Sequence, residues 1–402
     1  MKVIQINNFY NEGSTGKIVY DIKSELDKRH IDNIVCYGRG KDNNDSGVIR
    51  LGSNFYSKIC KLFSCINGLM YGGCYYSTYK LFKLIQSEKP DIVHLHCING
   101  NFVNIYKLIT FLKNKGIDTI ITLHAEFLYT ANCGYALDCD KWKNGCGSCP
   151  RLKKETQSFF FDRTHDSWIK LLNAYKGFDD SLYLVSVSPW LYSRAEESIL
   201  LSNYNHRVIL NGINTNVFRY KNHILKSKYN IPQDKKMVLH VTASFSRAIK
   251  GGKYVIEMAK RIPEVVFVIV GNDNHNMEFP PNVIDIGVVF DQDKLSEFYS
   301  MADVLLVTSE RETFCMPVAE SLSCGTPVVG FQAGAPEEIA LKEYSEFVRY
   351  GQINELEKAL REWLNKISDK EIISQIAQNK YSKERMSLEY ITLYEEIYNK
   401  TR

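Results

Sequence analysis

Short apolar runs rich in β-branched residues alternate with amphipathic stretches along the first half of the chain. Five such runs are typical of buried parallel strands: Lys2–Asn7, Asn33–Tyr37, Asp91–His96, Thr119–His124 and Leu182–Val187. Between them, helical spacing of apolar residues predicts three helices, at Lys17–Arg29, Ser77–Glu88 and Asn104–Lys115. Repeated alternation of strand and helix predicts a doubly wound α/β domain on a parallel sheet.

This pattern stops near residues 211–218 and then starts again, with a helix at Gly252–Arg261 and strands at Met237–Thr242, Val265–Val270, Asp303–Thr308 and Pro327–Phe331. A chain of 402 residues is long enough for two domains. We therefore expect two Rossmann-like domains, 1–217 and 218–385, facing each other across a cleft. The helical segment 386–402 is expected to pack back toward the first domain. Ligands of open parallel sheets bind beyond the carboxyl ends of the strands, so the chemistry should lie in the loops there.

Composition excludes several other classes of protein. The net charge of +4 is small for this length and comes without a concentrated basic stripe, which argues against a nucleic-acid partner. The opening MKVIQINNFY is typical of a strand rather than of a secretory signal, and no apolar run reaches the roughly 18–20 residues of a membrane span. The eleven cysteines are therefore expected to be reduced thiols in the cytoplasm.

The most informative segment runs from Ser309 to Val329. Glu312 ends a loop that follows a predicted strand. The next four residues can present backbone N–H groups to a phosphate at a helix start: Thr313, Phe314, Cys315 and Met316. Glu320 lies about one turn into that helix, where its carboxylate can accept hydrogen bonds from ribose hydroxyls. The turn Gly325-Thr326-Pro327 then leads into the next strand.

Two glutamates separated by seven residues, followed by Gly325-Thr326-Pro327 and by Gly334-Ala335-Pro336-Glu337, resemble the motif of glycosyltransferase family 4. The string Cys-Asp-Lys-Trp-Lys-x-Gly-Cys-Gly-x-Cys-Pro at 139–150 resembles a subgroup of this family, the surface-polysaccharide enzymes. The resemblance implies the GT-B fold, with Glu312 contacting the donor sugar and Glu320 the ribose. Where the family has glycines on either side of the phenylalanine, this chain has Thr313 and Cys315.

A second matching segment, Ser244 to Gly252, follows a predicted strand and resembles the family's basic loop ending in Lys-Gly. Cations there would stabilise the charge that develops on a departing diphosphate. Lys250 fits this role. The family's arginine lies six residues earlier, where this chain has Ser244, so Arg247 is the substitute cation that we expect.

The first domain offers further candidates at the ends of its strands. Gly13 and Gly16 join the first strand to the first helix, as in the family's glycine-rich loop near the donor. His124 matches the family's histidine beside the sugar ring, and His96 ends the neighbouring strand. Relatives often have His-Asp where this chain has His124-Ala125-Glu126, so Glu126 is a candidate for the acceptor-side carboxylate.

Four cysteines fall within a Cys-rich loop at 125–163: Cys133, Cys139, Cys146 and Cys149. The pair Cys146-x2-Cys149 has good zinc spacing, but Cys133-x5-Cys139 is not a standard knuckle. A structural zinc and four reduced thiols both remain open. Residues 55–76 also leave two interpretations, a helix in a membrane interface and a core helix, of which general frequencies favour the core helix.

The resemblance implies a retaining, metal-independent hexosyltransferase that needs no cofactor for catalysis. It would move a hexose or N-acetylhexosamine from a nucleoside diphosphate sugar, UDP favoured over GDP, to a glycan or undecaprenyl-linked acceptor. Its setting would be colanic acid, O-antigen or capsule synthesis, with peripheral contact at the inner membrane. The alternatives are a GDP-mannose-dependent mannosyltransferase, an epimerase of the same fold, and a non-catalytic nucleotide-sugar or glycan-binding protein.

Overall fold

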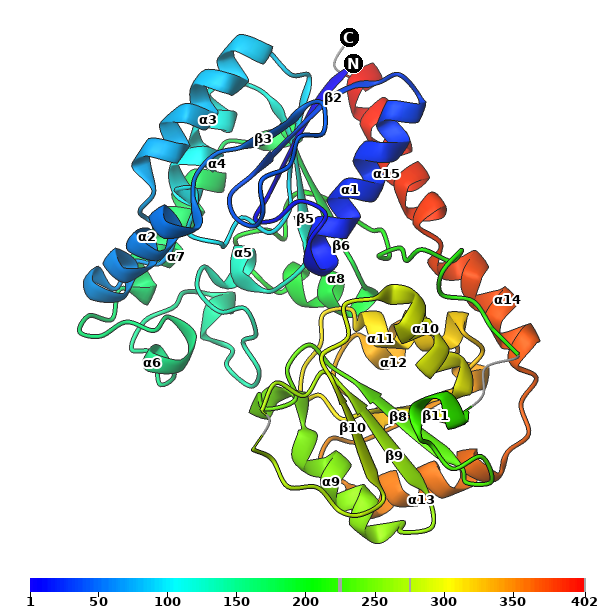
Figure 1. Ribbon diagram of the computed structural model, residues 1–402. Helices are drawn as coiled ribbons and strands as arrows, with labels where there is room; N and C mark the ends of the chain where they lie inside the picture. Colours follow the sequence, from blue (N-terminus) through cyan, green and yellow to red (C-terminus); the bar gives the residue numbers. More distant parts are fainter. Residues whose placement is uncertain (223–225, 275, 401–402) are drawn as a thin grey trace. The chain divides into compact units, whose positions relative to one another are not determined.

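The computed structural model describes residues 1–222, 226–274 and 276–400 (Figure 1). The chain divides into two compact units. The first comprises residues 1–210 and 386–402, and the second comprises residues 211–385. The first unit therefore ends a little before the predicted limit at residue 217. Each unit is an α/β domain on a parallel sheet, so the predicted pair of Rossmann-like domains is confirmed.

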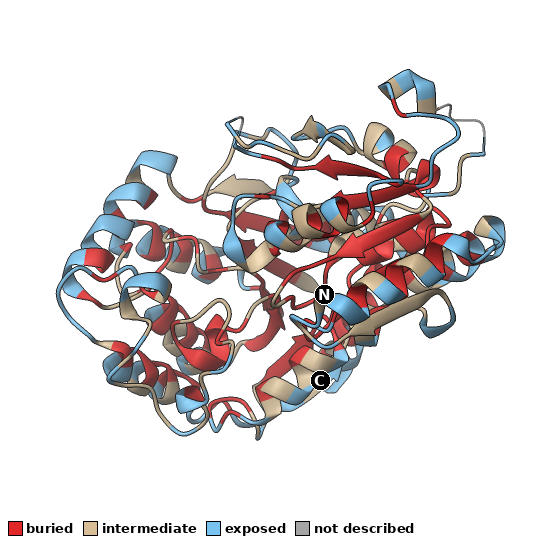
Figure 2. Cartoon of the chain, turned by 90° about the horizontal axis from the view of Figure 1, so that it is seen from below, coloured by how far each residue is buried: buried red, intermediate tan, exposed pale blue. Residues whose placement is uncertain are grey.

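The sheet of the first unit has seven parallel strands in the order β3-β2-β1-β4-β5-β6-β7. The strands are β1 Lys2–Asn7, β2 Asp32–Tyr37, β3 Val48–Arg50, β4 Ile92–Leu95, β5 Asp118–Leu123, β6 Leu182–Ser186 and β7 Asn205–Val208. The central strands β4, β5 and β6 are buried along their whole length, which agrees with their largely apolar sequences. Figure 2 colours buried residues red.

The helices of this unit are α1 Gly13–Lys28, α2 Asn54–Asn67, α3 Tyr75–Glu88, α4 Ile105–Asn114, α5 Phe127–Thr130, α6 Leu152–Glu155, α7 Thr164–Tyr175, α8 Pro189–Glu196 and α15 Lys383–Lys400. The last helix is the final element of the chain, yet it completes the core of the first unit. Met386, Tyr390 and Tyr394 of α15 are fully buried against residues such as Val3 and Ile120 of β1 and β5.

The second unit has a six-stranded parallel sheet in the order β10-β9-β8-β11-β12-β13. Its strands are β8 Met237–Val241, β9 Val266–Val270, β10 Val283–Gly287, β11 Val304–Val307, β12 Val328–Phe331 and β13 Ser345–Val348. Its helices are α9 Gly252–Arg261, α10 Gln292–Met301, α11 Met316–Ser323, α12 Pro336–Ile339, α13 Ile353–Asn365 and α14 Lys370–Tyr381. The strand order changes direction between β8 and β11, so loops after these two strands meet at the switch point.

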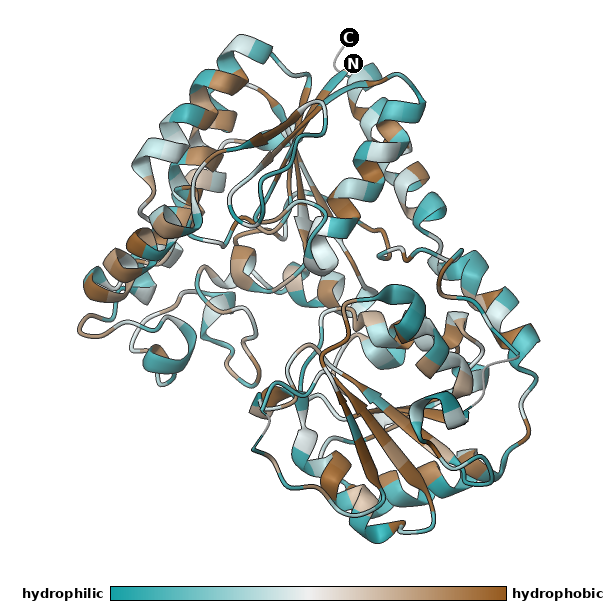
Figure 3. Ribbon diagram, in the orientation of Figure 1, coloured by the Kyte–Doolittle hydropathy of each residue, from teal (hydrophilic) through white to brown (hydrophobic). Residues whose placement is uncertain are grey.

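Helix α2 corrects one prediction. The favoured interpretation of residues 55–76 as a core helix is wrong, because α2 exposes its large apolar side chains and buries small ones such as Ser57 and Cys60. Figure 3 colours the hydrophobic residues of α2 brown on a helix at the edge of its unit. Among the described residues, no helix is both long and apolar enough to cross a bilayer.

Candidate active site

Lys250 and Glu312 form an ion pair at the switch point of the second unit. The Lys250 Nζ atom lies 2.6 Å from Glu312 Oε1, and both side chains are largely buried. Lys250 ends a short 3-10 turn, Ala248–Lys250, in the loop after β8, and Glu312 lies in the loop after β11. The two loops are also joined through the Glu310 N–H, which donates to the Ile249 carbonyl at 2.8 Å. Two predicted site residues are thus brought together.

The residue after Lys250 must be a glycine. Gly251 has a φ of +70°, and a Cβ atom there would lie 2.0 Å from the carbonyl oxygen of Thr308. The Thr308 hydroxyl in turn donates to the Lys250 carbonyl at 3.1 Å. This close approach holds Lys250 against the β11 loop.

Glu312 is also held by the motif near Gly334. Its N–H donates to the Ala333 carbonyl at 2.9 Å, and its carbonyl accepts from the Ala335 N–H at 3.2 Å. The carboxylate of Glu337 accepts from the N–H groups of Ala333 and Gly334, both at 3.0 Å. Burial raises the pKa of Glu337, whereas these N–H groups act to lower it. The Gly334–Glu337 segment therefore braces the backbone of Glu312.

Helix α11 begins at Met316, so Thr313, Phe314 and Cys315 lie in the preceding loop. Cys315 is at the N-cap position with a φ of 75°, and no side chain caps this end of the helix. The chain thus keeps a left-handed backbone where the family has glycine. Such a conformation costs roughly 1–2 kcal/mol for a residue with a Cβ atom.

Glu320 has a partner that sequence reasoning missed. The buried hydroxyl of Tyr299, on α10, donates to Glu320 Oε2 at 2.8 Å. Burial, and then the neighbouring carboxylate, raise the pKa of Tyr299 well above its usual range, so the phenol stays protonated. Tyr299 belongs to no local motif, and only the fold brings it beside Glu320.

An aspartate that follows β9, Asp273, holds the predicted basic loop. Ser244 donates its hydroxyl to Asp273, and the N–H of Ser246 donates to the same carboxylate at 3.1 Å. The Ser244 hydrogen bond is the main cause that lowers the pKa of Asp273 to about 2. Arg247 is exposed at the start of the following turn. Ser244 therefore shapes this loop through Asp273, in the position where the family has an arginine.

In the first unit, His96 and His124 directly follow the adjacent strands β4 and β5. The Nδ1 atom of His96 lies 3.2 Å from Nε2 of His124. The Nε2 atom of His96 lies 3.2 Å from the Gln5 side-chain oxygen. Both rings are buried, and burial lowers the pKa of His124 to about 3 and that of His96 well below its usual value. The two histidines are thus neutral, hydrogen-bonded rings at physiological pH.

A third histidine extends this buried network. The Nδ1 atom of His94 lies 2.6 Å from the Tyr394 hydroxyl, and Nε2 lies 2.7 Å from the Thr122 hydroxyl. The Thr122 oxygen is also 3.0 Å from the hydroxyl of Tyr390. Both tyrosines come from α15, so this polar network helps to fix the last helix on the sheet.

The remaining candidates of the first unit are Gly13, Gly16 and Glu126, and each has a structural role in the fold around it. Gly13 begins α1 with a φ of +65°, and a Cβ at Gly16 would lie 3.3 Å from the Asn11 nitrogen, so both residues serve the tight entry into α1. Glu126 is fully buried and accepts from Arg194 Nε at 3.0 Å. The Arg194 guanidinium lies over Trp142, 5.0 Å from the ring centroid. Glu126 therefore has an ionic partner in Arg194, and its acceptor-side role stays a prediction.

The four cysteines of the Cys-rich loop are free thiols of intermediate exposure, close enough to one another for their charges to interact. Within the described ranges, no three His, Cys, Asp or Glu side chains are arranged to hold a metal ion. The structural zinc stays a prediction. Cys146 Sγ lies 3.3 Å from the Thr130 carbonyl and acts as a weak donor.

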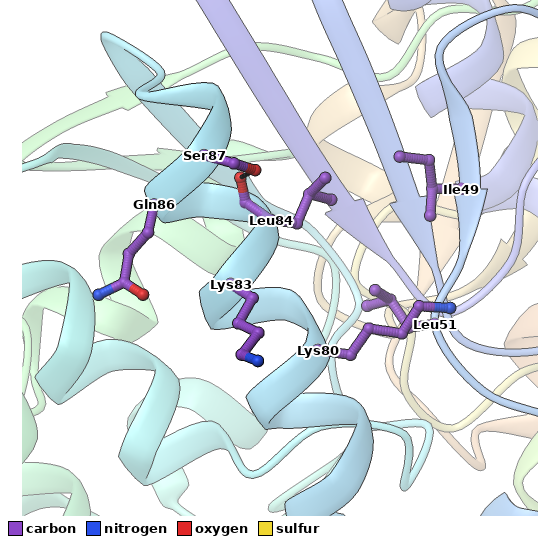
Figure 4. A pocket seen from close by; sticks show the side chains of 7 residues that line it. All are labelled: Ile49, Leu51, Lys80, Lys83, Leu84, Gln86 and Ser87. Atoms are coloured by element: carbon purple, nitrogen blue, oxygen red, sulfur yellow. Dashed lines mark hydrogen bonds between the residues drawn. The ribbon is translucent and has the colours of Figure 1, made fainter.

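A pocket of about 580 Å³ lies away from all these residues, between α3 and β3 (Figure 4). Its lining includes Ile49, Leu51, Lys80 and Lys83, none of which belongs to the candidate site. It is an open depression lined by both apolar and polar side chains. The chemistry of the molecule is better sought around Lys250 and Glu312.

Comparison with known proteins supports the choice of the Lys250 and Glu312 region as the candidate active site. Residues 222–380, which include Lys250, Glu312 and Glu320, match the family model described as "Glycosyl transferases group 1". They therefore form a group 1 glycosyltransferase domain, and glycosyltransferase activity is the function that the comparisons support.

Among individual proteins, the chain is similar to WcaC of Escherichia coli (strain K12), named for colanic acid biosynthesis as a glycosyl transferase. The identity is 21%, over 99% of this chain and 100% of WcaC. The sucrose-phosphate synthase of Thermosynechococcus elongatus has a similar structure, with a TM-score of 0.70, 14% identity and 99% of each chain covered. HepE of Anabaena, solved with UDP-glucose, has a TM-score of 0.63 and 13% identity, over 98% of this chain and 100% of HepE. The likeness in structure confirms the expected GT-B fold.

Proposed function

We propose that this chain is a retaining, metal-independent glycosyltransferase of family 4 that uses a nucleoside diphosphate sugar. The transferred group is a hexose or an N-acetylhexosamine, and UDP is the favoured nucleotide over GDP. The observation that carries the proposal is the 2.6 Å pair of Lys250 and Glu312, inside the segment that matches group 1 glycosyltransferases. The complex of the similar protein HepE with UDP-glucose supports the choice of UDP.

The acceptor that we propose is a glycan or an undecaprenyl-linked oligosaccharide in bacterial surface polysaccharide synthesis. Support comes from the likeness to WcaC, which is named for colanic acid biosynthesis. The reaction would then occur on the cytoplasmic side of the inner membrane, in peripheral contact with it.

In the proposed reaction, the acceptor hydroxyl approaches the anomeric carbon on the face from which the diphosphate departs. The new carbon–oxygen bond forms as the bond to the diphosphate breaks, and the hydroxyl proton passes to the departing diphosphate. Negative charge grows on that leaving group, so a fixed cation and helix N–H groups aimed at it accelerate the step. Lys250 is the cation, helped by Arg247 and by the N-terminus of α11.

The ion pair gives Lys250 and Glu312 linked roles in binding. A diphosphate that draws the Lys250 ammonium away leaves the Glu312 carboxylate to accept hydrogen bonds from the donor-sugar hydroxyls. Glu320, oriented by Tyr299, accepts from the ribose. His124, neutral because it is buried, lies beside the sugar ring in this proposal.

Donor binding is tested first by thermal unfolding against UDP, GDP and their sugar conjugates. A ligand that binds only the folded protein stabilises it by about 2.7 kcal/mol at a hundredfold excess over its Kd. We expect UDP compounds to raise the melting temperature, and Glu320→Ala to abolish the shift. A folded, monodisperse protein that responds to no nucleotide would argue for a different function.

Transfer is tested with the donor so identified and a panel of glycan and lipid-linked acceptors. Glu312→Ala should abolish transfer while the protein stays folded, and the exposed Glu343→Ala should retain it. An epimerase would instead release epimerised sugar without any acceptor. A binding protein would give a thermal shift but no product with any acceptor.

A further inference from the structure

One side of α2 exposes a continuous apolar stripe. Phe55, Ile59, Leu62, Phe63 and Ile66 recur at helical spacing and all face solvent, with 73% of Phe55 exposed. The opposite side of the helix buries Ser57, Cys60, Ser64 and Cys65. This arrangement inverts what a helix packed on a core normally does, since the larger apolar residues lie outside.

A loop from a distant part of the chain extends this stripe. Phe159, Phe160 and Phe161 are all exposed, Phe160 by 71%. The Phe159 N–H donates to the Cys65 carbonyl near the end of α2 at 2.8 Å. A Cβ on Gly68, which follows α2, would lie 2.3 Å from the Phe161 carbonyl oxygen, so the two backbones touch. We call these eight side chains of α2 and the loop the apolar surface.

Helices α2 and α3 both carry exposed lysines. Lys58 and Lys61 are exposed on α2 itself, and Lys80 and Lys83 on α3. Residues 46–87 contain no aspartate or glutamate. The segment that holds α2 and most of α3 therefore carries a net positive charge, because it has lysines and no acidic residue of its own.

Exposed tyrosines lie at the start of α3. Tyr75, Tyr76 and Tyr79 face solvent. The Tyr76 N–H donates to the Tyr56 hydroxyl of α2 at 3.2 Å, which links the two helices. The Lys83 ammonium lies 4.8 Å from the ring centroid of Tyr79. Amphipathic rings paired with lysines are typical of the zone where a membrane meets water.

We propose that the apolar surface docks onto an anionic lipid bilayer, with α2 lying along the membrane and the lysines among the headgroups. An amphipathic helix with aromatic residues on one side and lysines beside them binds lipid interfaces in this way. Contact surfaces between proteins are instead depleted in lysine. The inference rests on the membrane contact named in the proposed function and deepens it by assigning the surface that makes this contact, while a failure to bind vesicles would leave the transfer reaction untouched.

The test uses the full chain and vesicle flotation, with phosphatidylcholine alone compared with an equal mixture of phosphatidylcholine and phosphatidylglycerol. The protein should float with the mixed vesicles, much less with the neutral ones, and less as salt is added. Lys58→Gln and Lys61→Gln should each weaken binding to the mixed vesicles roughly fivefold.

Apolar contact is tested by Phe63→Ser and Phe160→Ser, which should weaken flotation with both kinds of vesicle. The matched control is Phe290→Ser in the second unit, since Phe290 is 90% exposed and lies outside the apolar surface. It should float as the unchanged protein does. Equal unfolding temperatures for all variants would exclude misfolding as the cause.

Two results would overturn the proposal. One is a folded protein that does not float with mixed vesicles, or whose Phe63 and Phe160 variants float equally well. The other is a concentration-dependent dimer, seen by light scattering and lost in the same variants, without any vesicle binding. The second result would assign the surface to another copy of this chain.

Discussion

Lys250 and Glu312, 62 residues apart in the chain, lie in adjacent loops with 2.6 Å between ammonium and carboxylate. Each neutralises the other in a site that is largely shielded from water. A substitution at one of them therefore changes two groups that the proposed reaction uses.

Lys250→Gln should lower the transfer rate about a hundredfold to a thousandfold, since one fixed donor to the charge of the transition state is lost. It should also cost about 1–3 kcal/mol of stability, because Glu312 loses its partner. Steady-state kinetics and urea unfolding measure the two effects. Lys253→Gln, three residues along and exposed, should change neither.

Tyr299→Phe should weaken donor binding by roughly tenfold, which corresponds to about 1.4 kcal/mol, while kcat changes less. The phenol orients the Glu320 carboxylate, so its loss affects the ribose contact. Tyr229→Phe is a close control, because the Tyr229 hydroxyl likewise donates to a glutamate, Glu297, which lies outside the candidate site. An equal effect of both variants on the donor KM would contradict the positioning role of Tyr299.

Gly251→Ala and Gly287→Ala separate steric conflict from backbone strain. Their φ angles are 70° and 71°, but only at Gly251 would a Cβ meet another atom within 4 Å. Gly287→Ala should therefore cost roughly 1–2 kcal/mol and keep activity. Gly251→Ala should displace Lys250 and abolish transfer. An equal loss of activity in both variants would contradict the steric role of Gly251 in positioning Lys250.

Tyr394→Phe should destabilise the first unit by about 1–3 kcal/mol, because it leaves a buried nitrogen of His94 without its partner. For a unit of this size, that lowers the melting temperature by about 2–4 °C per kcal/mol. Scanning calorimetry would measure the shift. The exposed Tyr79→Phe is expected to stay within about 0.5 kcal/mol of the unchanged protein.

The buried histidines predict a dependence of stability on pH. Burial lowers the pKa of His124 to about 3, and those of His94 and His96 are also lowered. Below about pH 6.5 these histidines bind protons in the unfolded chain but stay neutral in the folded chain. The free energy of unfolding is therefore highest above that pH and declines below it. His96→Gln should reduce the slope of the unfolding free energy against pH, measured by urea unfolding at several pH values. An unchanged slope would contradict this prediction.

The sequence alone predicts the central strands of both sheets well, because burial on both sides makes them continuous apolar runs. Strand β1 and helix α9 have the predicted bounds, Lys2–Asn7 and Gly252–Arg261. The edge strands β3, β7, β10 and β13 were not predicted. They are short and only partly buried, so their residues carry no apolar run to recognise.

The site was predictable where spacing carries the information. The interval between Glu312 and Glu320 and the Lys250-Gly251 pair are local features of the chain. Tyr299 and Asp273 are not, because each reaches its partner only through the order of the strands. Helix α2 was misjudged for a related reason, since composition does not reveal which side of a helix meets the core.

Helix α15 also has a consequence for synthesis on the ribosome. The first unit needs this helix, yet its residues are translated after the whole of the second unit. The nascent chain must therefore hold residues 1–210 in an incomplete state while the second unit emerges and folds. A premature stop near residue 385 would spare the group 1 domain and leave the opposite end of the polypeptide without part of its core.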